Sequence, residues 1–158
     1  MAATRFDLVS DWYFDTPVER IWAELITPEA WPDWWRAVKK VEVLSEGDTI
    51  GVGAVRRFTW GTALPYTLSF NMTATKIEPM RLIEGEARGE LDGLGRWTLT
   101  PEGQGQGTHV RYDWMVDVTK PWQVALSPIL RPVFAWNHNI VLGWGQDDLK
   151  TRLRKTAN

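Results

Sequence analysis

Two histidines, at positions 109 and 138, are the side chains of this sequence best suited to proton transfer near neutral pH. His138 follows Phe134 by one turn of a predicted helix and stands next to Asn137. This spacing places it near the edge of the helix face that is directed inward. We expect it to act there either as a structural hydrogen-bonding group or as a general acid or base. His109 has the outward parity of its predicted strand, so we assign it no role.

Two tyrosines and one arginine could add polar groups to the same interior. Tyr66 and Tyr112 share the strand parity of large apolar neighbours, and a buried phenol requires a hydrogen-bond partner in the protein or on a ligand. Arg56 has the parity of Phe58, which would turn it inward toward a carboxylate or an anionic ligand. Alternatively, its guanidinium reaches water at the end of the strand. If the site is catalytic, we expect its acid–base groups to be His138, Tyr66 and Arg56.

The composition excludes several other chemistries. The chain has no cysteine, and its two histidines are expected to differ in exposure, so neither thiolate catalysis nor a zinc site is predicted. The glycines within 102–107 do not join a strand to a helix, as a dinucleotide-binding fingerprint requires. No serine lies in a nucleophile-elbow motif. We therefore expect no metal and no cofactor.

Charge and hydropathy limit the possible partners and location. The formal net charge of −2 provides no positive field that would attract nucleic acid or an anionic membrane. No apolar run approaches the length of a membrane span, and the N-terminal residues do not resemble a secretory signal. We expect a cytoplasmic protein that forms a single domain over residues 1–158.

The N-terminal third predicts one strand followed by two short helices. Hydrophobic residues alternate over 5–15, which is typical of a half-buried strand. Thr16, Pro17 and Glu19 then resemble a capping box with proline at the first helical position. Pro32 disfavours helical geometry just before it, so we expect a short or broken helix over 28–37.

Three tryptophans gather in that second helical segment. We expect Trp31 and Trp34 to seal the open end of a sheet, and Trp35 to line the wall of a cavity.

The remainder predicts about six further antiparallel strands and a terminal helix. Turn residues divide 38–118 into successive alternating segments, of which 66–78 has the most regular alternation. Residues 133–155 contain no proline and have apolar side chains over a wide arc, which indicates a helix gripped by other elements. A curved sheet of about seven strands wrapped around this helix would leave room for a cavity between them.

The inward parities of the strands and of the helix predict the lining of that cavity, although the same side chains could also fill it as a packed core. The expected lining residues are Trp35, Phe58, Tyr66, Phe70, Trp97, Tyr112, Trp114, Phe134, Asn137, His138 and Val141.

Four segments resemble one known superfamily: TPVERIWAELITPEAWPDWW, LPYTLSF, EGEARGELDGLGRWTLT and RPVFAWNHN. Together with the order of the elements, they are similar to START/Bet v 1-like (SRPBCC) proteins, and within these to the polyketide cyclase/dehydratase-like group of bacterial proteins. The resemblance covers about residues 5 to 154. It implies an α+β helix-grip fold with a deep hydrophobic cavity. Members bind lipids, sterols, plant hormones, quinones or polyketides, and some are cyclases or aromatases.

Three functions remain open at this point. The leading hypothesis is binding of a hydrophobic small molecule, such as a lipid, a polyketide or an aromatic compound. The first alternative is an aromatase/cyclase that uses the His, Tyr and Arg side chains of its cavity. The second is a partner-binding domain like the co-chaperone members of the fold, for which an exposed aromatic patch around Trp31 and Trp122 would be evidence.

Overall fold

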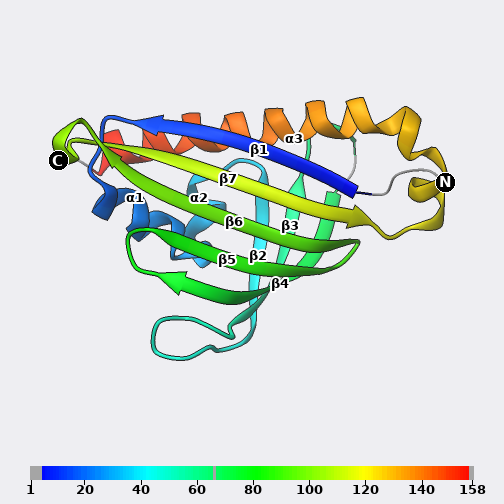
Figure 1. The fold of residues 1–158 in the computed structure, drawn as a ribbon, viewed down its shortest axis with the longest axis horizontal. Coiled ribbons are helices and arrows are strands. Elements are labelled where there is room, and N and C mark those ends of the chain that lie inside the picture. The colour runs from blue at the N-terminus through cyan, green and yellow to red at the C-terminus, as the bar shows by residue number, and fades with distance from the viewer. Residues whose placement is uncertain (1–4, 66, 157–158) are drawn as a thin grey trace.

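The chain forms one antiparallel sheet of seven strands that curves around a long C-terminal helix, as the computed structural model shows for residues 5–65 and 67–156 (Figure 1). The strands follow the order β1-β7-β6-β5-β4-β3-β2 across the sheet. The elements are β1 (Arg5–Phe14), α1 (Val18–Leu25), η1 (Pro28–Ala30), α2 (Trp31–Trp34), β2 (Val38–Ser45), β3 (Val55–Gly61), β4 (Thr67–Glu78), β5 (Leu82–Gly89), β6 (Leu91–Glu102), η2 (Gly103–Gly105), β7 (Gly107–Val118) and α3 (Pro121–Lys155). The predicted helix-grip architecture is confirmed.

The short helices close one end of the sheet, and α3 runs along its length (Figure 1). The predicted capping box is wrong: Pro17 is the N-cap of α1, and no side chain caps this helix. Instead, the main-chain carbonyl of Thr16 accepts a hydrogen bond of 2.7 Å from Oγ1 of buried Thr108 on β7. The start of α1 is therefore fixed by the sheet rather than by its own first turn.

Helix α3 is longer than the sequence predicts. It begins at Pro121, twelve residues before the predicted start at 133, and includes Pro128 and Pro132 in its interior. Each internal proline removes one main-chain hydrogen bond, which bends a helix without ending it when neighbouring elements support both sides. The additional turns extend over the end of the sheet that the short helices leave open.

Two tryptophans attach the C-terminal half of α3 to β1 and to the end of α2. Trp12 donates its indole N–H to the Leu142 carbonyl at 2.9 Å, and Trp35 donates to the Val141 carbonyl at 3.0 Å. Both rings lie against Gly145, where a Cβ atom would be only 2.6–2.7 Å from their ring atoms. The glycine therefore permits the close approach on which both hydrogen bonds depend.

Charged pairs reinforce this attachment at the surface. Arg36 Nη2 lies 2.6 Å from Asp148 Oδ1, and Arg152 Nε lies 2.8 Å from Glu24 Oε2. These pairs connect α3 to the two short helices. They are partly exposed, so we expect them to contribute less to stability than the buried tryptophan contacts.

The buried side chains form two clusters. The larger one unites the short helices, the middle of the sheet and the C-terminal half of α3. The smaller one lies where β1 begins and β7 ends, and Val124 and Phe134 of α3 pack against it. The first half of α3 thus covers the less extensively packed end of the sheet.

We expect Gly145→Ala to lower the free energy of unfolding by about 1–3 kcal/mol, because the added methyl group overlaps the rings of Trp12 and Trp35. The matched control is Gly143→Ala, two residues earlier in the same helix, where a Cβ meets no atom within 4 Å. That control should raise stability by about 0.5–1 kcal/mol through helix propensity alone. Urea denaturation of both variants measures the difference, and equal effects would contradict the close-approach argument.

Candidate functional site

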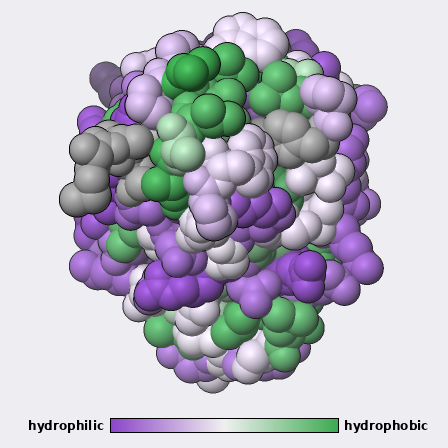
Figure 2. Space-filling model, turned by 90° about the vertical axis from the view of Figure 1, so that its right-hand side faces the viewer, coloured by the Kyte–Doolittle hydropathy of each residue, from purple (hydrophilic) through white to green (hydrophobic). Residues whose placement is uncertain are grey.

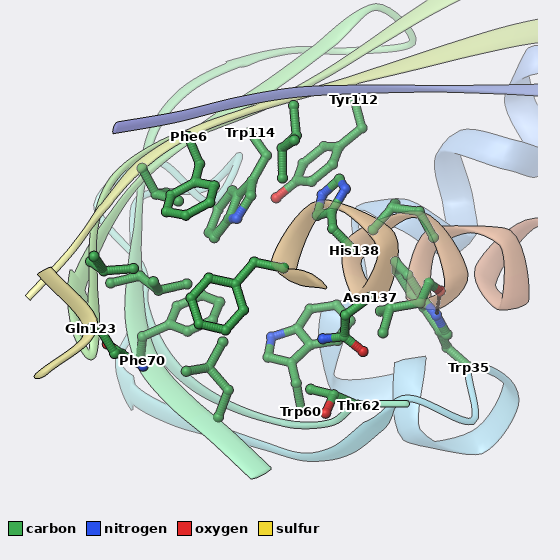
Figure 3. A pocket seen from close by; sticks show the side chains of 18 of the residues that line it. Phe6, Trp35, Trp60, Thr62, Phe70, Tyr112, Trp114, Gln123, Asn137 and His138 are labelled. Atoms are coloured by element: carbon green, nitrogen blue, oxygen red, sulfur yellow. Dashed lines mark hydrogen bonds between the residues drawn. The ribbon is translucent and has the colours of Figure 1, made fainter. Parts of the chain in front are cut away.

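A cavity of about 140 Å³ lies between the sheet and α3, from Gln123 in the first turn of the helix to Leu142 near its middle. Its wall is formed mostly by aromatic and aliphatic side chains from β1, β3, β4, β6, β7 and α3 (Figure 3). The structure places these predicted lining residues on it: Trp35, Phe70, Trp97, Tyr112, Trp114, Phe134, Asn137, His138 and Val141. Tyr66 lies outside the described residues.

A second cavity of about 80 Å³ lies beside the first. The two share the side chains of Trp31, Trp60, Phe70, Trp97 and Tyr112, which therefore form the partition between them.

Phe58 and Arg56 border this second cavity rather than the main one. Arg56 is turned toward the interior, as its parity predicts, and its Nε donates to Oε1 of Glu29 at 2.8 Å. Its charge is thus already paired with a carboxylate of the segment that follows α1. The structure does not bring Arg56 together with His138 on the wall of the main cavity.

His138 lies on the cavity wall with its ring nearly parallel to that of Tyr112, at a centroid separation of 6.4 Å and an interplanar angle of 12°. Both ring nitrogens are buried, and no hydrogen bond of ordinary geometry reaches them from the described residues. Burial lowers the pKa of His138 to about 4, although the nearby Asn139 side chain opposes this shift. The imidazole is therefore neutral at pH 7, with one donor and one acceptor nitrogen.

Tyr112 lies on the walls of both cavities and packs against Trp97 at a centroid separation of 4.1 Å. Burial raises the pKa of its phenol above the usual value, so the hydroxyl stays protonated. Gly95 on β6 makes room for it, because a Cβ at that position would lie 2.8 Å from the Tyr112 oxygen.

Asn137 has a structural role at the cavity wall. Its Oδ1 accepts a hydrogen bond of 2.8 Å from the main-chain N–H of Ala63. This contact connects α3 to the turn between β3 and β4.

Gln123 lies on the wall although the sequence does not predict it for the site, whereas the inward strand parity of Phe58 and Trp60 predicts Trp60. Oε1 of Gln123 and Nε1 of Trp60 are both buried without a hydrogen-bond partner in the described part of the chain. Gln123 was missed because the helix was predicted to begin at 133. Pro121 at the first position of α3 is the signal that could have revealed the earlier start.

The tryptophans of the second short helix are all buried. Trp35 lies on the cavity wall, Trp31 lies on the walls of both cavities, and Trp34 stacks on Trp35 at a centroid separation of 5.6 Å. Trp31 is only 5% exposed, so it is not part of an exposed aromatic patch with Trp122, which would have been evidence for a partner-binding domain.

Trp122 instead begins an exposed apolar stripe on the outer face of α3, followed by Leu126, Ile129, Val133 and Trp136. Figure 2 shows hydrophobic side chains gathered at the top of this end of the molecule, where α3 begins. Over these turns α3 is apolar on the outside, whereas Gln123, Asn137 and His138 are directed to the cavity.

The comparison with known families is decisive. The family described as polyketide cyclase / dehydrase and lipid transport matches residues 6–154. This chain belongs to that family. A search of the curated proteins finds no match.

Solved structures show that this member of the family shares its fold with proteins of the START superfamily. A START superfamily protein from Mycobacterium smegmatis has a TM-score of 0.77 at 15% identity, over 94% of this chain and 97% of that one. An aromatase/cyclase from a Streptomyces species has a TM-score of 0.77 at 14% identity, over 98% and 96%. Norcoclaurine synthase from Thalictrum has a TM-score of 0.59 at 13% identity, over 93% and 98%.

Two further findings concern membrane-spanning helices and metal sites. Within residues 5–65 and 67–156, no helix combines the length and the hydropathy needed to cross a bilayer. The same residues contain no group of three or more His, Asp or Glu side chains placed to bind a metal ion.

Because the folded pKa of His138 is about 4 and the unfolded value is about 6.5, only the unfolded chain binds a proton between these pH values. Stability is therefore complete above pH 6.5 and falls as the pH is lowered, by about 2 kcal/mol between pH 7 and pH 5. Urea denaturation at pH 7 and pH 5 should show that the free energy of unfolding of His138→Gln lacks this decrease of about 2 kcal/mol. His109→Gln, which changes a surface histidine, should retain it; an identical pH dependence in both variants would contradict the assignment.

Proposed function

We propose that this protein binds a hydrophobic small molecule in the main cavity between the sheet and α3. The observation that carries the proposal is the space of about 140 Å³ with a mostly apolar wall. Apolar cavities of about 150 Å³ in other proteins stay dry and bind a single benzene ring. The match to a family that includes lipid transport proteins supports the same function.

The expected affinity follows from the area that a ligand of this size can bury. One substituted benzene ring that buries about 200 Å² of apolar surface gains about 5 kcal/mol at ~25 cal/mol per Å², before ordering costs. This gain corresponds to a Kd of about 0.2 mM. A natural ligand with higher affinity therefore needs either more apolar area or polar contacts.

More area becomes available if the two cavities join. Trp60 belongs to the partition between them, and its buried indole N–H has no hydrogen-bond partner among the described residues. Trp12, Trp31 and Trp35, in contrast, each donate to a main-chain carbonyl. Rotation of Trp60 would break its ring contacts with Trp31, Trp35 and Phe58 but no such hydrogen bond, so we infer that a ligand longer than one ring displaces this side chain.

Catalysis of the aromatase/cyclase type is the second candidate, favoured by the neutral His138 beside the Tyr112 hydroxyl in the cavity. A neutral imidazole can remove a proton from a β-keto chain, and a protonated phenol can donate to the carbonyl oxygen. However, a pKa of about 4 makes His138 a weak base at neutral pH. Efficient general bases have a pKa near the working pH, so we rank binding above catalysis.

We expect p-xylene to bind the cavity and to shift the indole N–H signals of Trp35, Trp60 and Trp97 saturably in ¹H–¹⁵N NMR spectra. Val116→Phe should abolish these shifts, because Val116 lies on the cavity wall and the larger ring occupies the space. Val9→Phe is the matched control at an exposed position of β1 and should bind as the wild type does.

Thermal melts followed by circular dichroism establish that both variants are folded. An absence of saturable shifts in the wild-type protein would overturn the proposed function, as would unchanged binding in folded Val116→Phe.

A further inference from the structure

The wall of the main cavity contains no Asp, Glu, Lys or Arg among the described residues that line it. Two charged side chains border the second cavity instead, and each is paired. Arg56 contacts Glu29 at 2.8 Å, and Glu84 contacts Arg96 at 2.5 Å. An ionised group on a ligand would therefore lose its water in the main cavity and gain no opposite charge there.

The same wall contains polar atoms without partners in the described part of the chain. They are Nδ1 and Nε2 of His138, Nε1 of Trp60 and Oε1 of Gln123. The Tyr112 hydroxyl lies on the same wall, and burial keeps it protonated by raising its pKa. Buried polar groups are normally hydrogen-bonded, and this concentration in one cavity indicates a partner that the protein itself does not supply.

The positions of these groups define where such a partner would lie. Tyr112 and His138 lie on one side of the cavity, and Trp60 lies on the opposite side with Thr62 (Figure 3). Gln123 lies apart from them, in the first turn of α3. The region between His138 and Trp60 is therefore polar at both walls and apolar around them.

We propose that the main cavity selects an uncharged aromatic compound with a hydrogen-bonding group that can both donate and accept, such as a phenol or an amide, placed between Trp60 on one side and His138 and Tyr112 on the other. This inference rests on the proposed function, because it specifies the ligand of the same cavity. It assigns Tyr112, His138 and Trp60 as specificity-determining residues.

The donors and acceptors of the three residues suit such a group. A neutral imidazole offers one N–H and one acceptor nitrogen, a phenol can donate and accept, and the indole can only donate. A ligand hydroxyl or amide can pair with both the donors and the acceptors of these residues, whereas a carboxylate can only accept hydrogen bonds. Since His138 stays neutral at pH 7, it provides no counter-charge for a carboxylate.

Four para-substituted toluenes test the inference at pH 7: p-xylene, p-cresol, 4-methylbenzamide and 4-methylbenzoate. Their shapes are closely matched, and the last two differ mainly in charge. We expect 4-methylbenzamide to bind at least about 30-fold more tightly than 4-methylbenzoate, as measured by the indole N–H shifts and by calorimetry. Both p-cresol and the amide should also bind more tightly than p-xylene.

Variants separate hydrogen bonding from packing. Tyr112→Phe and His138→Leu should each weaken the binding of p-cresol and of 4-methylbenzamide by about 5- to 10-fold. The affinity for p-xylene should stay within about twofold of the wild-type value. Tyr13→Phe, which removes the hydroxyl of an exposed tyrosine on β1, is the matched control and should change none of the four affinities.

Binding of 4-methylbenzoate within threefold of the amide would overturn the inference and leave the proposed function intact. If both cavity variants weaken the binding of p-xylene and of p-cresol equally, the inference is overturned as well, because the two side chains would then act only by packing. If p-xylene itself does not bind to the wild-type protein, the proposed function fails, and the inference fails with it.

Discussion

The contact of Trp12 and Trp35 with α3 at Gly145 is the constraint on which the rest of this structure depends. Two indole N–H groups donate to consecutive carbonyls of the helix, at Val141 and Leu142, and a glycine one turn later lets the rings reach them. This arrangement fixes both the distance and the rotation of the C-terminal half of α3 against the sheet. The cavity begins at this contact, because Trp35, Val141 and Leu142 lie on its wall, and it extends along α3 to Gln123 in the first turn.

The first half of α3 has an unusual distribution of side chains for a helix on a sheet. Its polar residues Gln123, Asn137 and His138 face the interior, while Ile129 on the outer face is 73% exposed. A helix that only completed a hydrophobic core would show the opposite pattern. Polar atoms in an apolar interior destabilise a fold unless they are paired. Asn137 is paired with the main chain of Ala63, but the unpaired atoms of Gln123 and His138 are better explained by a ligand than by the packing of the protein itself.

The periodicity of the sequence was sufficient to predict the sheet and its curvature around a helix, because inward and outward residues alternate along nearly every strand. It also predicted that Trp35 would face the interior. Prediction from the sequence failed where a local signal competes with tertiary contacts. Pro132 was interpreted as a boundary although the helix continues through it, and Thr16 binds Thr108 rather than capping α1.

The chemistry of the site was harder to predict for the same reason. Strand parity correctly directs Arg56 inward, but its partner Glu29 comes from a segment 27 residues earlier, and no periodic pattern predicts such a pairing. The neutral state of His138 likewise depends on burial by side chains from several strands. Parity predicts the direction of a side chain, whereas charge state and pairing are decided by which elements meet.

The place of Trp60 in the sheet does not depend on its ring. Its main chain is paired with Val38 on β2 and Leu68 on β4, whereas its indole packs against Trp31, Trp35 and Phe58. A smaller side chain at this position would therefore remove one of the five side chains that separate the two cavities, while the strand pairing around it stays in register.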